Sequence, residues 1–333
     1  MVRLRRTSPD SPGWTRRRAG RGFVYLDSEG GRLPAEHVQR ITELAIPPAW
    51  KDVWITPYPH GHLQAVGTDD AGRRQYLYHP EWRARRDAEK FERMLAFGEA
   101  VTRARSVVLT DLGHTGMPVE RACAAAVRLI DLGSFRIGND IYADTNGSFG
   151  LTTLERRHVR RAEERLVFRF VGKSGVSHRI EIDDVPVIDA VQVMRRRRAD
   201  DPRLLAYKQQ RSWQAVLPVL VNDYLRERTG VEGSAKDFRT WHATVLAAAA
   251  LARTEEPGHS AASRKRAVSG AMKQVAAFLG NTPTLARSSY VDPRVIEAYE
   301  QGRTITSATR DDFANRDERQ AAWEKDVLRL LEA

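Results

Sequence analysis

The chain has 333 residues, enough for two domains or for one large domain with a well-buried core. Its 54 Lys and Arg residues outnumber 43 Asp and Glu, and the net charge of +11 favours nucleic acid as partner over an anionic membrane surface. The single Cys123 excludes an internal disulfide and a cysteine metal cluster, and no apolar run is long enough to span a membrane. Without an apolar leader, we expect a cytoplasmic, nucleoid-associated protein.

The first 90 residues are predicted to form a small, mainly β domain. Residues 1–20 are rich in Arg with Pro and Gly, and we expect a basic, poorly ordered arm there. Short segments rich in β-branched and aromatic residues follow, separated by Gly, Pro and Asp, and an amphipathic helix is expected over residues 35–44. The segments that predict strands are residues 23–26, 53–55, 64–67 and 75–78.

Residues 91–333 are predicted to form a larger, mainly helical domain, which makes the fold class α+β. A charged helical pattern starts near residue 81, and we place the boundary within it, near residue 90. One hairpin is expected among the helices, with strands over 165–171 and 176–182 and Lys173 at its tip. The remaining helices are expected over residues 118–132, 212–228, 235–252, 263–279, 292–301 and 310–331.

Three short motifs suggest cofactors but lack the required spacing. The Gly-Lys-Ser run that starts at Gly172 is not a nucleotide-binding loop, because Val167 stands where that loop needs a glycine. His60 and His62 have no spaced second pair of metal ligands, and the carboxylate pair that starts at Asp69 is typical of a hairpin turn. We therefore expect neither a metal nor a nucleotide cofactor.

A tyrosine near the C-terminus, Tyr290, is preceded at wide intervals by the basic residues Arg136, Lys173 and Arg239. Phosphodiester transfer develops charge on nonbridging oxygens, which paired guanidinium groups are suited to hold. A flexible lysine can protonate the leaving oxygen, and a tyrosine hydroxyl that attacks phosphorus keeps the bond energy in a covalent ester. This set of residues predicts a catalytic site that cuts and reseals a nucleic-acid strand.

The segments that carry these residues resemble the poxvirus-like and bacterial type IB DNA topoisomerases over nearly the whole chain. The family's first catalytic arginine lies in Phe-Arg-Ile-Gly, as Arg136 does here, and its catalytic lysine ends a Phe-Val-Gly-Lys hairpin strand, as Lys173 does. Its second arginine lies in Lys-Asp-Leu-Arg-Thr, which is similar to the segment around Arg239. The resemblance implies that Tyr290 is the nucleophile.

The same resemblance implies a fourth phosphate ligand nine positions before the tyrosine, which is Asn281. Poxvirus and eukaryotic members have histidine there, so Asn281 is a departure from the family pattern. Its neutral amide donates a hydrogen bond to a nonbridging oxygen but cannot become cationic. Because Asn281 follows Leu279 and Gly280 at a predicted helix end, a helix cap is the alternative interpretation.

Further matches to the family imply DNA contacts. Tyr142 resembles a residue that meets the DNA backbone beside the cleavage site, and Lys236 is expected to support the phosphate or a nearby base edge. Gln75, Tyr76 and Tyr78 resemble a strand of the small domain that reads a groove. Because alternate residues of a strand share a face, the two tyrosines are expected to point together, although aromatic residues on a strand also serve as core.

The resemblance implies a monomeric clamp that relaxes supercoiled duplex DNA through a 3′-phosphotyrosyl intermediate, without metal or ATP. A tyrosine recombinase is the nearest alternative, but such enzymes usually have His-x-x-Arg where this chain has Lys236 three residues before Arg239. Their N-terminal domain is normally helical, whereas residues 22–79 predict strands. A non-catalytic architectural DNA-binding protein is a second alternative, since it requires only the basic charge.

Overall fold

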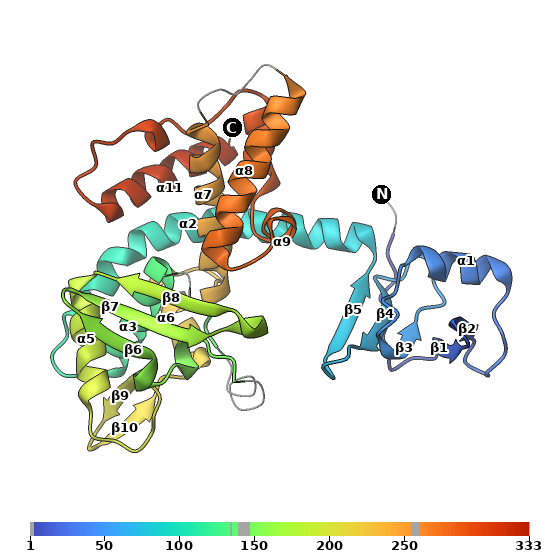
Figure 1. Ribbon diagram of the computed structural model, residues 1–333, viewed down its shortest axis with the longest axis horizontal. Coiled ribbons are helices and arrows are strands. Elements are labelled where there is room, and N and C mark those ends of the chain that lie inside the picture. Colours follow the sequence, from blue (N-terminus) through green and yellow to red (C-terminus); the bar gives the residue numbers. More distant parts are fainter. Residues whose placement is uncertain (1–2, 134, 139–146, 255–259, 333) are drawn as a thin grey trace. The chain divides into compact units, whose positions relative to one another are not determined.

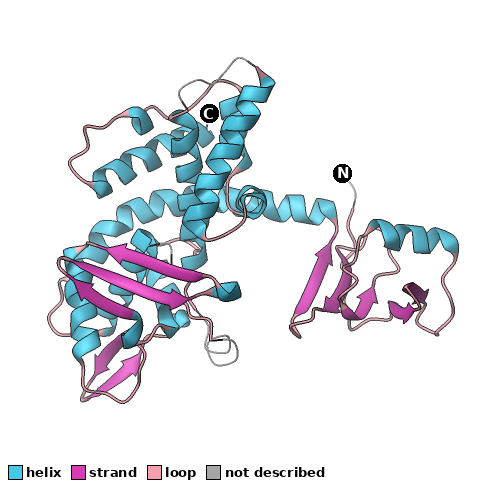
Figure 2. Ribbon diagram, in the orientation of Figure 1, coloured by secondary structure: helices cyan, strands magenta, loops and turns pink. Residues whose placement is uncertain are grey.

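The computed structural model describes residues 3–133, 135–138, 147–254 and 260–332. The chain forms two compact units, Met1–Phe91 and Glu92–Ala333, and the border between them falls inside helix α2, Pro80–Leu112 (Figure 1). Strands dominate the first unit and helices the second, as the colouring in Figure 2 shows, so the fold is α+β as predicted. In the described part of the chain, no helix is long and apolar enough to cross a membrane.

The first unit is an antiparallel five-stranded sheet with one helix. The strand order is β2-β1-β3-β4-β5, so β5 is an edge strand. All four strands expected from the sequence are present, as is the helix. The elements are β1 (Trp14–Ala19), β2 (Gly22–Leu26), α1 (Ala35–Glu43), β3 (Lys51–Ile55), β4 (Leu63–Thr68) and β5 (Arg74–Tyr78).

The basic N-terminal segment is more ordered than we expected from its composition. Trp14–Ala19 forms β1 between β2 and β3, where the arm of residues 1–20 was predicted to lack structure. Before it, the backbone N–H of Arg5 donates to the carbonyl of His60, and that of His62 donates to the carbonyl of Arg5. The prediction was wrong because these backbone hydrogen bonds and the burial of Trp14 outweigh a composition typical of tails.

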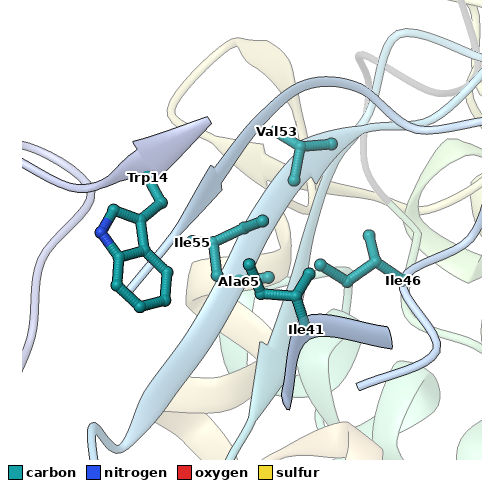
Figure 3. Packing of buried hydrophobic residues seen from close by; sticks show 6 residues of the cluster. All are labelled: Trp14, Ile41, Ile46, Val53, Ile55 and Ala65. Carbon is teal, nitrogen blue, oxygen red and sulfur yellow. The ribbon is translucent and has the colours of Figure 1, made fainter. Parts of the chain in front are cut away.

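The core of the first unit lies between the sheet and α1 (Figure 3). Alternation along β3 points Val53 and Ile55 inward, and Ile41 comes from the buried side of α1. Leu77 of β5 packs against this core, so the residues that alternate with it face outward. The buried cluster consists of Trp14, Ile41, Ile46, Val53, Ile55 and Ala65.

The second unit packs helices around a three-stranded antiparallel sheet, β6-β7-β8, and a two-stranded hairpin, β9-β10. Its helices after α2 are α3 (Val119–Gly133), α5 (Val185–Arg196), α6 (Pro218–Thr229), α7 (Ala235–Ala252), α8 (Ala261–Leu279), α9 (Pro283–Ser289), α10 (Pro293–Glu300) and α11 (Arg316–Glu332). Its strands are β6 (Val159–Ala162), β7 (Arg165–Val171), β8 (Ser177–Ile182), β9 (Ala206–Gln209) and β10 (Ser212–Ala215). Short 3-10 turns are η1 (Leu151–Thr153), η2 (Arg156–His158), η3 (Lys173–Gly175) and η4 (Ser307–Thr309).

Helices α3 and α7 form the centre of this unit. Almost every residue of both is buried, because runs of alanine let neighbouring elements approach closely. On α7, Trp241 is fully buried beside Gly98 of α2, where an added Cβ would lie 2.5 Å from the indole ring. The ring of Phe238 packs edge-on against Phe97 at a centroid distance of 5.3 Å. This packing makes α7 a rigid support for the polar residues it carries.

Two helix predictions need correction. Residues 212–228 were expected to be one helix, but Ser212–Ala215 forms β10, which pairs with a strand that was not predicted, and α6 begins only at Pro218. The cause is local, since Gln210 adopts a positive φ of 53° in the tight turn and Pro218 at the first helical position sets a new start. The last helix begins at Arg316, later than the predicted residue 310.

Candidate active site

Helix α7 places Arg239 at the centre of the candidate site. The helix starts with a capping box, in which the Asp237 carboxylate accepts from the backbone N–H and the hydroxyl of Ser234. Arg239 follows within the next turn and is only 4% exposed. Its Nη2 donates to the carbonyl oxygen of Leu279 at 2.7 Å, at the C-terminus of α8. This bond fixes the guanidinium beside the turn that leads to α9.

Tyr290 lies in the turn between α9 and α10, where it ends α9. Thr244, one turn beyond Arg239 on α7, holds this turn through its hydroxyl, which donates to the carbonyl oxygen of Tyr290 at 3.3 Å. The same hydroxyl accepts the backbone N–H of Asp292 at 3.1 Å. The ring of Tyr290 is half-buried, with the guanidinium carbon of Arg239 at 5.7 Å from its centroid. One helix therefore positions both the tyrosine and its neighbouring arginine.

Arg136 is held by a close approach of two backbone segments. The carbonyl oxygen of Arg136 accepts the N–H of Leu151 at 2.8 Å. Gly138 adopts a φ of 100°, and an added Cβ on Gly150 would lie only 2.4 Å from the Gly138 Cα. Only a residue without a side chain fits at position 150, because the two chains touch there. The Phe-Arg-Ile-Gly segment recognised in the sequence is thus fixed by a partner segment that follows it.

The neighbouring Phe135 anchors this segment in the core. Phe135 is 1% exposed and packs edge-on against Phe168 of β7, with ring centroids 5.0 Å apart. It stacks on Phe170 of the same strand at 6.0 Å. Aromatic contacts of this kind add to the free energy gained by burying the rings. They join the Arg136 segment to the hairpin that bears Lys173.

Asn281 meets Arg136 at the end of α8. The helix ends at Gly280 in the left-handed conformation, with a φ of 62°, and the N–H of Asn281 donates to the carbonyl oxygen of Ala276. The Asn281 side chain is not used as a cap. Its Oδ1 accepts from Arg136 Nη2 at 3.0 Å, and its Nδ2 is buried without a hydrogen-bond partner among the described residues. A buried donor left unpaired costs about 1–3 kcal/mol of stability, so this amide is suited to donate a hydrogen bond to a bound ligand.

The two arginines change the electrostatics of the tyrosine. Burial alone would raise the pKa of Tyr290, but the charge of Arg239 and hydrogen bonding from Arg136 lower it below its usual value. Burial and the nearby charge of Arg136 lower the pKa of Arg239 to about 10. Arg239 therefore stays cationic at neutral pH. Two like charges beside a half-buried phenol favour the phenolate and a bound anion.

Lys173 lies at the tip of the β7-β8 hairpin, as predicted from the sequence. The tip is the 3-10 turn η3, closed by the N–H of Gly172, which donates to the carbonyl oxygen of Val176 at 2.8 Å. The Lys173 side chain is exposed, and none of the described residues forms a hydrogen bond or an ion pair with its ammonium. The hairpin therefore presents an exposed cation.

One residue of the site was missed in the sequence. His178 of β8 is half-buried and stacks on Phe170, with ring centroids 5.1 Å apart. Burial lowers the pKa of His178, and the charges of Arg136 and Arg239 lower it further. Its place in an alternating strand predicted burial only. No sequence signal indicated that the ring would lie beside the arginines.

The residues expected to contact DNA differ in how far their side chains are exposed. Tyr76 and Tyr78 share the outer face of the edge strand β5, stacked at a centroid distance of 6.2 Å and 45% and 37% exposed. Gln75 points to the other face, and its Nε2 donates to Asp69 at 2.9 Å. Lys236 is exposed on the first turn of α7. Tyr142 lies outside the described residues.

Three residues that the sequence analysis did not assign to the site have structural roles. Cys123 is 1% exposed in α3, where burial raises the pKa of its thiol to about 12, as expected for an inert core residue. His62 accepts the backbone N–H of Thr7 through Nδ1 at 3.1 Å, and its ring packs edge-on against Trp82. The carboxylate of Asp69 accepts from the N–H groups of Ala71 and Arg73, which confirms the predicted turn.

Comparison with known proteins supplies independent information. Residues 79–314 match the family model described as eukaryotic DNA topoisomerase I, catalytic core. Residues 22–69 match the model described as bacterial DNA topoisomerase IB, N-terminal domain. Each compact unit therefore contains a match to a model of this family.

Three viral relatives agree with these matches. A DNA topoisomerase 1B of Acanthamoeba polyphaga mimivirus is 28% identical over 294 residues, 86% of this chain and 87% of the relative. DNA topoisomerase 1 of rabbit fibroma virus is 20% identical over 249 residues, 74% of this chain and 75% of the relative. DNA topoisomerase 1B of vaccinia virus (strain Copenhagen) is 25% identical over 143 residues, 43% of this chain and 45% of the relative.

Proposed function

Because the chain belongs to the type IB DNA topoisomerase family and is therefore an isomerase that acts on DNA, we propose that Tyr290 is its nucleophile. The observation that carries the proposal is the meeting of Tyr290 with Arg136, Arg239 and Asn281. Four residues from separate segments converge there, and the Asn281 Nδ2 is a buried donor without a partner among the described residues. A phosphodiester is the anion that fits a cationic pocket beside a phenol.

In the proposed reaction, the Tyr290 hydroxyl oxygen attacks the scissile phosphorus and the bond from phosphorus to the 5′ oxygen breaks. The products are a 3′-phosphotyrosyl ester and a free 5′-hydroxyl, and the phenolic proton passes to solvent. Lys173 transfers a proton to the departing oxygen from the hairpin tip. Reverse attack by the 5′-hydroxyl reseals the strand without a metal, and ATP is not needed because the ester retains the bond energy.

Arg136, Arg239 and Asn281 stabilise the charge that grows on the nonbridging oxygens during attack. Arginine provides planar, fixed donors for this purpose, and the Asn281 amide adds one neutral donor. Support for this role of Asn281 comes from its Oδ1, which is occupied by Arg136 and so leaves the amide nitrogen as the free group. A donor directed at developing negative charge stabilises the transition state more than a donor directed at a neutral group.

We also propose that residues 1–90 are a DNA-clamp domain with a basic N-terminal segment and that residues 91–333 are the catalytic domain. Tyr76 and Tyr78, with Gln75 beside them, contact the duplex on the side of the small domain. Lys236 and Tyr142 contact it near the cleavage site. The protein acts as a monomer on supercoiled duplex DNA in the cytoplasm, associated with the nucleoid.

Relaxation of supercoiled plasmid tests the proposal directly. In excess chelator and without ATP, the protein is expected to relax the plasmid, and Tyr290→Phe is expected to bind DNA without relaxing it. Absence of relaxation by the unaltered protein, or full activity of Tyr290→Phe, would disprove the proposed chemistry. Strand exchange between paired duplexes would instead indicate a recombinase, and binding without a covalent adduct on nicked duplexes an architectural protein.

A further inference from the structure

The imidazole of His178 lies at a junction within the catalytic unit. In the β7-β8 pairing, His178 is directly opposite Phe170, and the two rings stack with an interplanar angle of 21°. Phe170 also stacks on Phe135, the residue before Arg136. His178 is thus the outermost ring of an aromatic series that begins in the core, and it ends next to the candidate active site.

The same ring covers the backbone that leads into Lys173. An added Cβ on Gly172 would lie 2.7 Å from both Cδ2 and Nε2 of His178. The φ of Gly172 is −98°, which any residue adopts, so the backbone conformation does not require glycine there. The imidazole occupies the space that a side chain at position 172 would need. Gly172 and His178 therefore fit each other at the base of the lysine turn.

Cε1 of the same ring, the atom next to Nε2, faces the turn that carries Asn281. An added Cβ on Gly280 would lie 3.2 Å from Cε1 of His178. One imidazole therefore touches the hairpin at Gly172 and the end of α8 at Gly280. Burial and the charges of Arg136 and Arg239 lower the pKa of His178, which keeps the ring neutral and able to pack closely.

We propose that His178 is a positioning residue that holds the Lys173 hairpin against the Gly280–Asn281 turn. The inference rests on the proposed function, since it acts through the role of Lys173 as proton donor. The Lys173 side chain is exposed, whereas the base of its turn packs against the imidazole ring. Clamping the base limits where the ammonium reaches. A misplacement of about 1 Å can slow a reaction on the order of 10²-fold, so this contact affects the rate.

Cleavage under single-turnover conditions with saturating enzyme, on two suicide duplexes, tests the inference. One duplex has the normal 5′ oxygen at the scissile phosphate and the other has sulfur at that bridging position. A thiolate leaves without being protonated, because thiols are far more acidic than alcohols. His178→Ala is expected to cleave the oxygen substrate on the order of 10²-fold more slowly than the unaltered protein. On the sulfur substrate the two rates are expected to agree within about threefold, since the proton donor contributes nothing there.

Four variants serve as references. Lys173→Ala is expected to behave like His178→Ala, and Arg136→Ala to be slow on both substrates. His178→Phe, which keeps a flat ring against Phe170, is expected to retain most of the rate on oxygen. Arg179→Ala is the matched control, because Arg179 is the next residue of the strand, is exposed and pairs with Glu181. It is expected to cleave both substrates at the unaltered rate.

A second test uses the fit between Gly172 and His178. Gly172→Ala is expected to slow cleavage of the oxygen substrate, because its Cβ displaces the ring. When His178→Ala is already present, the same change is expected to have little further effect, since the space is empty. Additive effects of the two substitutions would contradict a shared contact.

The outcomes separate this inference from the proposed function. Equal slowing of His178→Ala on both substrates, or no slowing at all, overturns the positioning role. A His178→Phe variant as slow as His178→Ala also overturns it, because the imidazole nitrogens would then be in use. Sulfur rescue of Lys173→Ala but not of His178→Ala rejects this inference alone. A Lys173→Ala variant that is slow on both substrates rejects the proton-donor role, and this inference with it.

Discussion

Arg136 and Asn281 are 145 positions apart in the sequence, and the Nη2 of Arg136 donates to the Oδ1 of Asn281 at 3.0 Å. The bond determines which end of the amide is available, because Oδ1 is occupied and the buried Nδ2 has no partner in the described part of the chain. An asparagine so oriented presents a donor at the position where the resemblance described above gives histidine in poxvirus and eukaryotic members. The departure from the family pattern thus retains a donor at this position.

Substitution of Asn281 tests this orientation. Asn281→Ala removes one donor and is expected to slow cleavage of a suicide duplex on the order of 10²–10³-fold. Asn281→Asp keeps the shape but adds an acceptor and a negative charge, so we expect a larger loss. Asn281→His restores an N–H donor and is expected to lose least. Single-turnover cleavage rates measure all three, and an Asn281→Asp variant as active as the unaltered protein would contradict the role.

The lowered pKa of Tyr290 predicts a pH dependence. The charge of Arg239 favours the phenolate, so the ionisation of Tyr290 is expected below the usual pKa of tyrosine, about 10. The cleavage rate should rise with pH up to that ionisation. Arg239→Ala removes the cation, so the ionisation of Tyr290 is expected to move to higher pH.

Ultraviolet absorbance of tyrosinate measures this ionisation directly. The difference between titrations of the unaltered protein and of Tyr290→Phe isolates Tyr290 from the other tyrosines. An ionisation that stays at the same pH in Arg239→Ala would show that the arginine charge does not act on the phenol.

The contact between Gly138 and Gly150 predicts an effect on the rate with little loss of DNA binding. Gly150→Ala places a Cβ 2.4 Å from the Gly138 Cα, so the backbone that holds Arg136 must shift. We expect cleavage to slow on the order of 10²-fold. Gly270→Ala is the matched control, because no atom lies within 4 Å of its added Cβ in α8. That change is expected to raise the free energy of unfolding by about 0.5–1 kcal/mol and leave the rate unchanged.

A buried ion cluster predicts a stability effect away from the chemistry. Arg105 of α2 pairs with Asp131 at 2.8 Å and with the fully buried Glu324 at 2.6 Å. Arg105→Ala removes the guanidinium shared by two buried carboxylates and is expected to lower the free energy of unfolding by about 3–5 kcal/mol. Arg103→Ala, on the exposed side of the same helix, is expected to change it by less than about 1 kcal/mol. Thermal and denaturant unfolding measure the difference.

The same cluster predicts how acid changes the free energy of unfolding. Burial alone would raise the pKa of Asp131, but Arg105 and His242 hold it well below its usual value. Its contribution to stability is therefore full above the unfolded pKa, about 3.9, and is lost as the pH falls toward the folded pKa. In Arg105→Ala the folded pKa of Asp131 rises, so acid unfolding is expected to begin at higher pH. Identical acid unfolding curves would contradict this account.

The two faces of β5 predict unequal effects on DNA binding. Tyr76→Ala and Tyr78→Ala remove exposed, stacked rings and are each expected to weaken duplex binding about tenfold, or about 1.4 kcal/mol. Gln75→Ala is expected to do less, because its amide is bound to Asp69. Equilibrium binding at one fixed salt concentration measures this, since phosphate contacts make every affinity depend on salt. A Gln75→Ala variant weaker than both tyrosine variants would reverse the assignment.

Local patterns in the sequence determined the elements that carry the chemistry. Alternation of apolar residues and a Gly-Lys-Ser-Gly turn predicted the hairpin with Lys173 at its tip, and both strands are present. The same alternation predicted that Tyr76 and Tyr78 share a face, and apolar helical sequence predicted the buried Cys123. These features depend on neighbours a few residues apart, so the chain itself specifies them. The Trp14–Ala19 strand was missed because its Arg-rich composition is typical of a tail, although its hairpin partner β2 follows directly along the chain.

Only the tertiary structure decided which side chains meet. The orientation of Asn281 depends on its bond to Arg136, and the close packing of Gly150 depends on Gly138. The position of His178 depends on the end of α8, where Gly280 lies near its ring. None of these contacts is set by local preference, because each joins segments that are distant in the sequence and brought together by packing around α3 and α7. The sequence by itself determined which elements hold the residues that we propose as catalytic. Long-range packing determined their geometry, since it alone fixes the distances between separate elements.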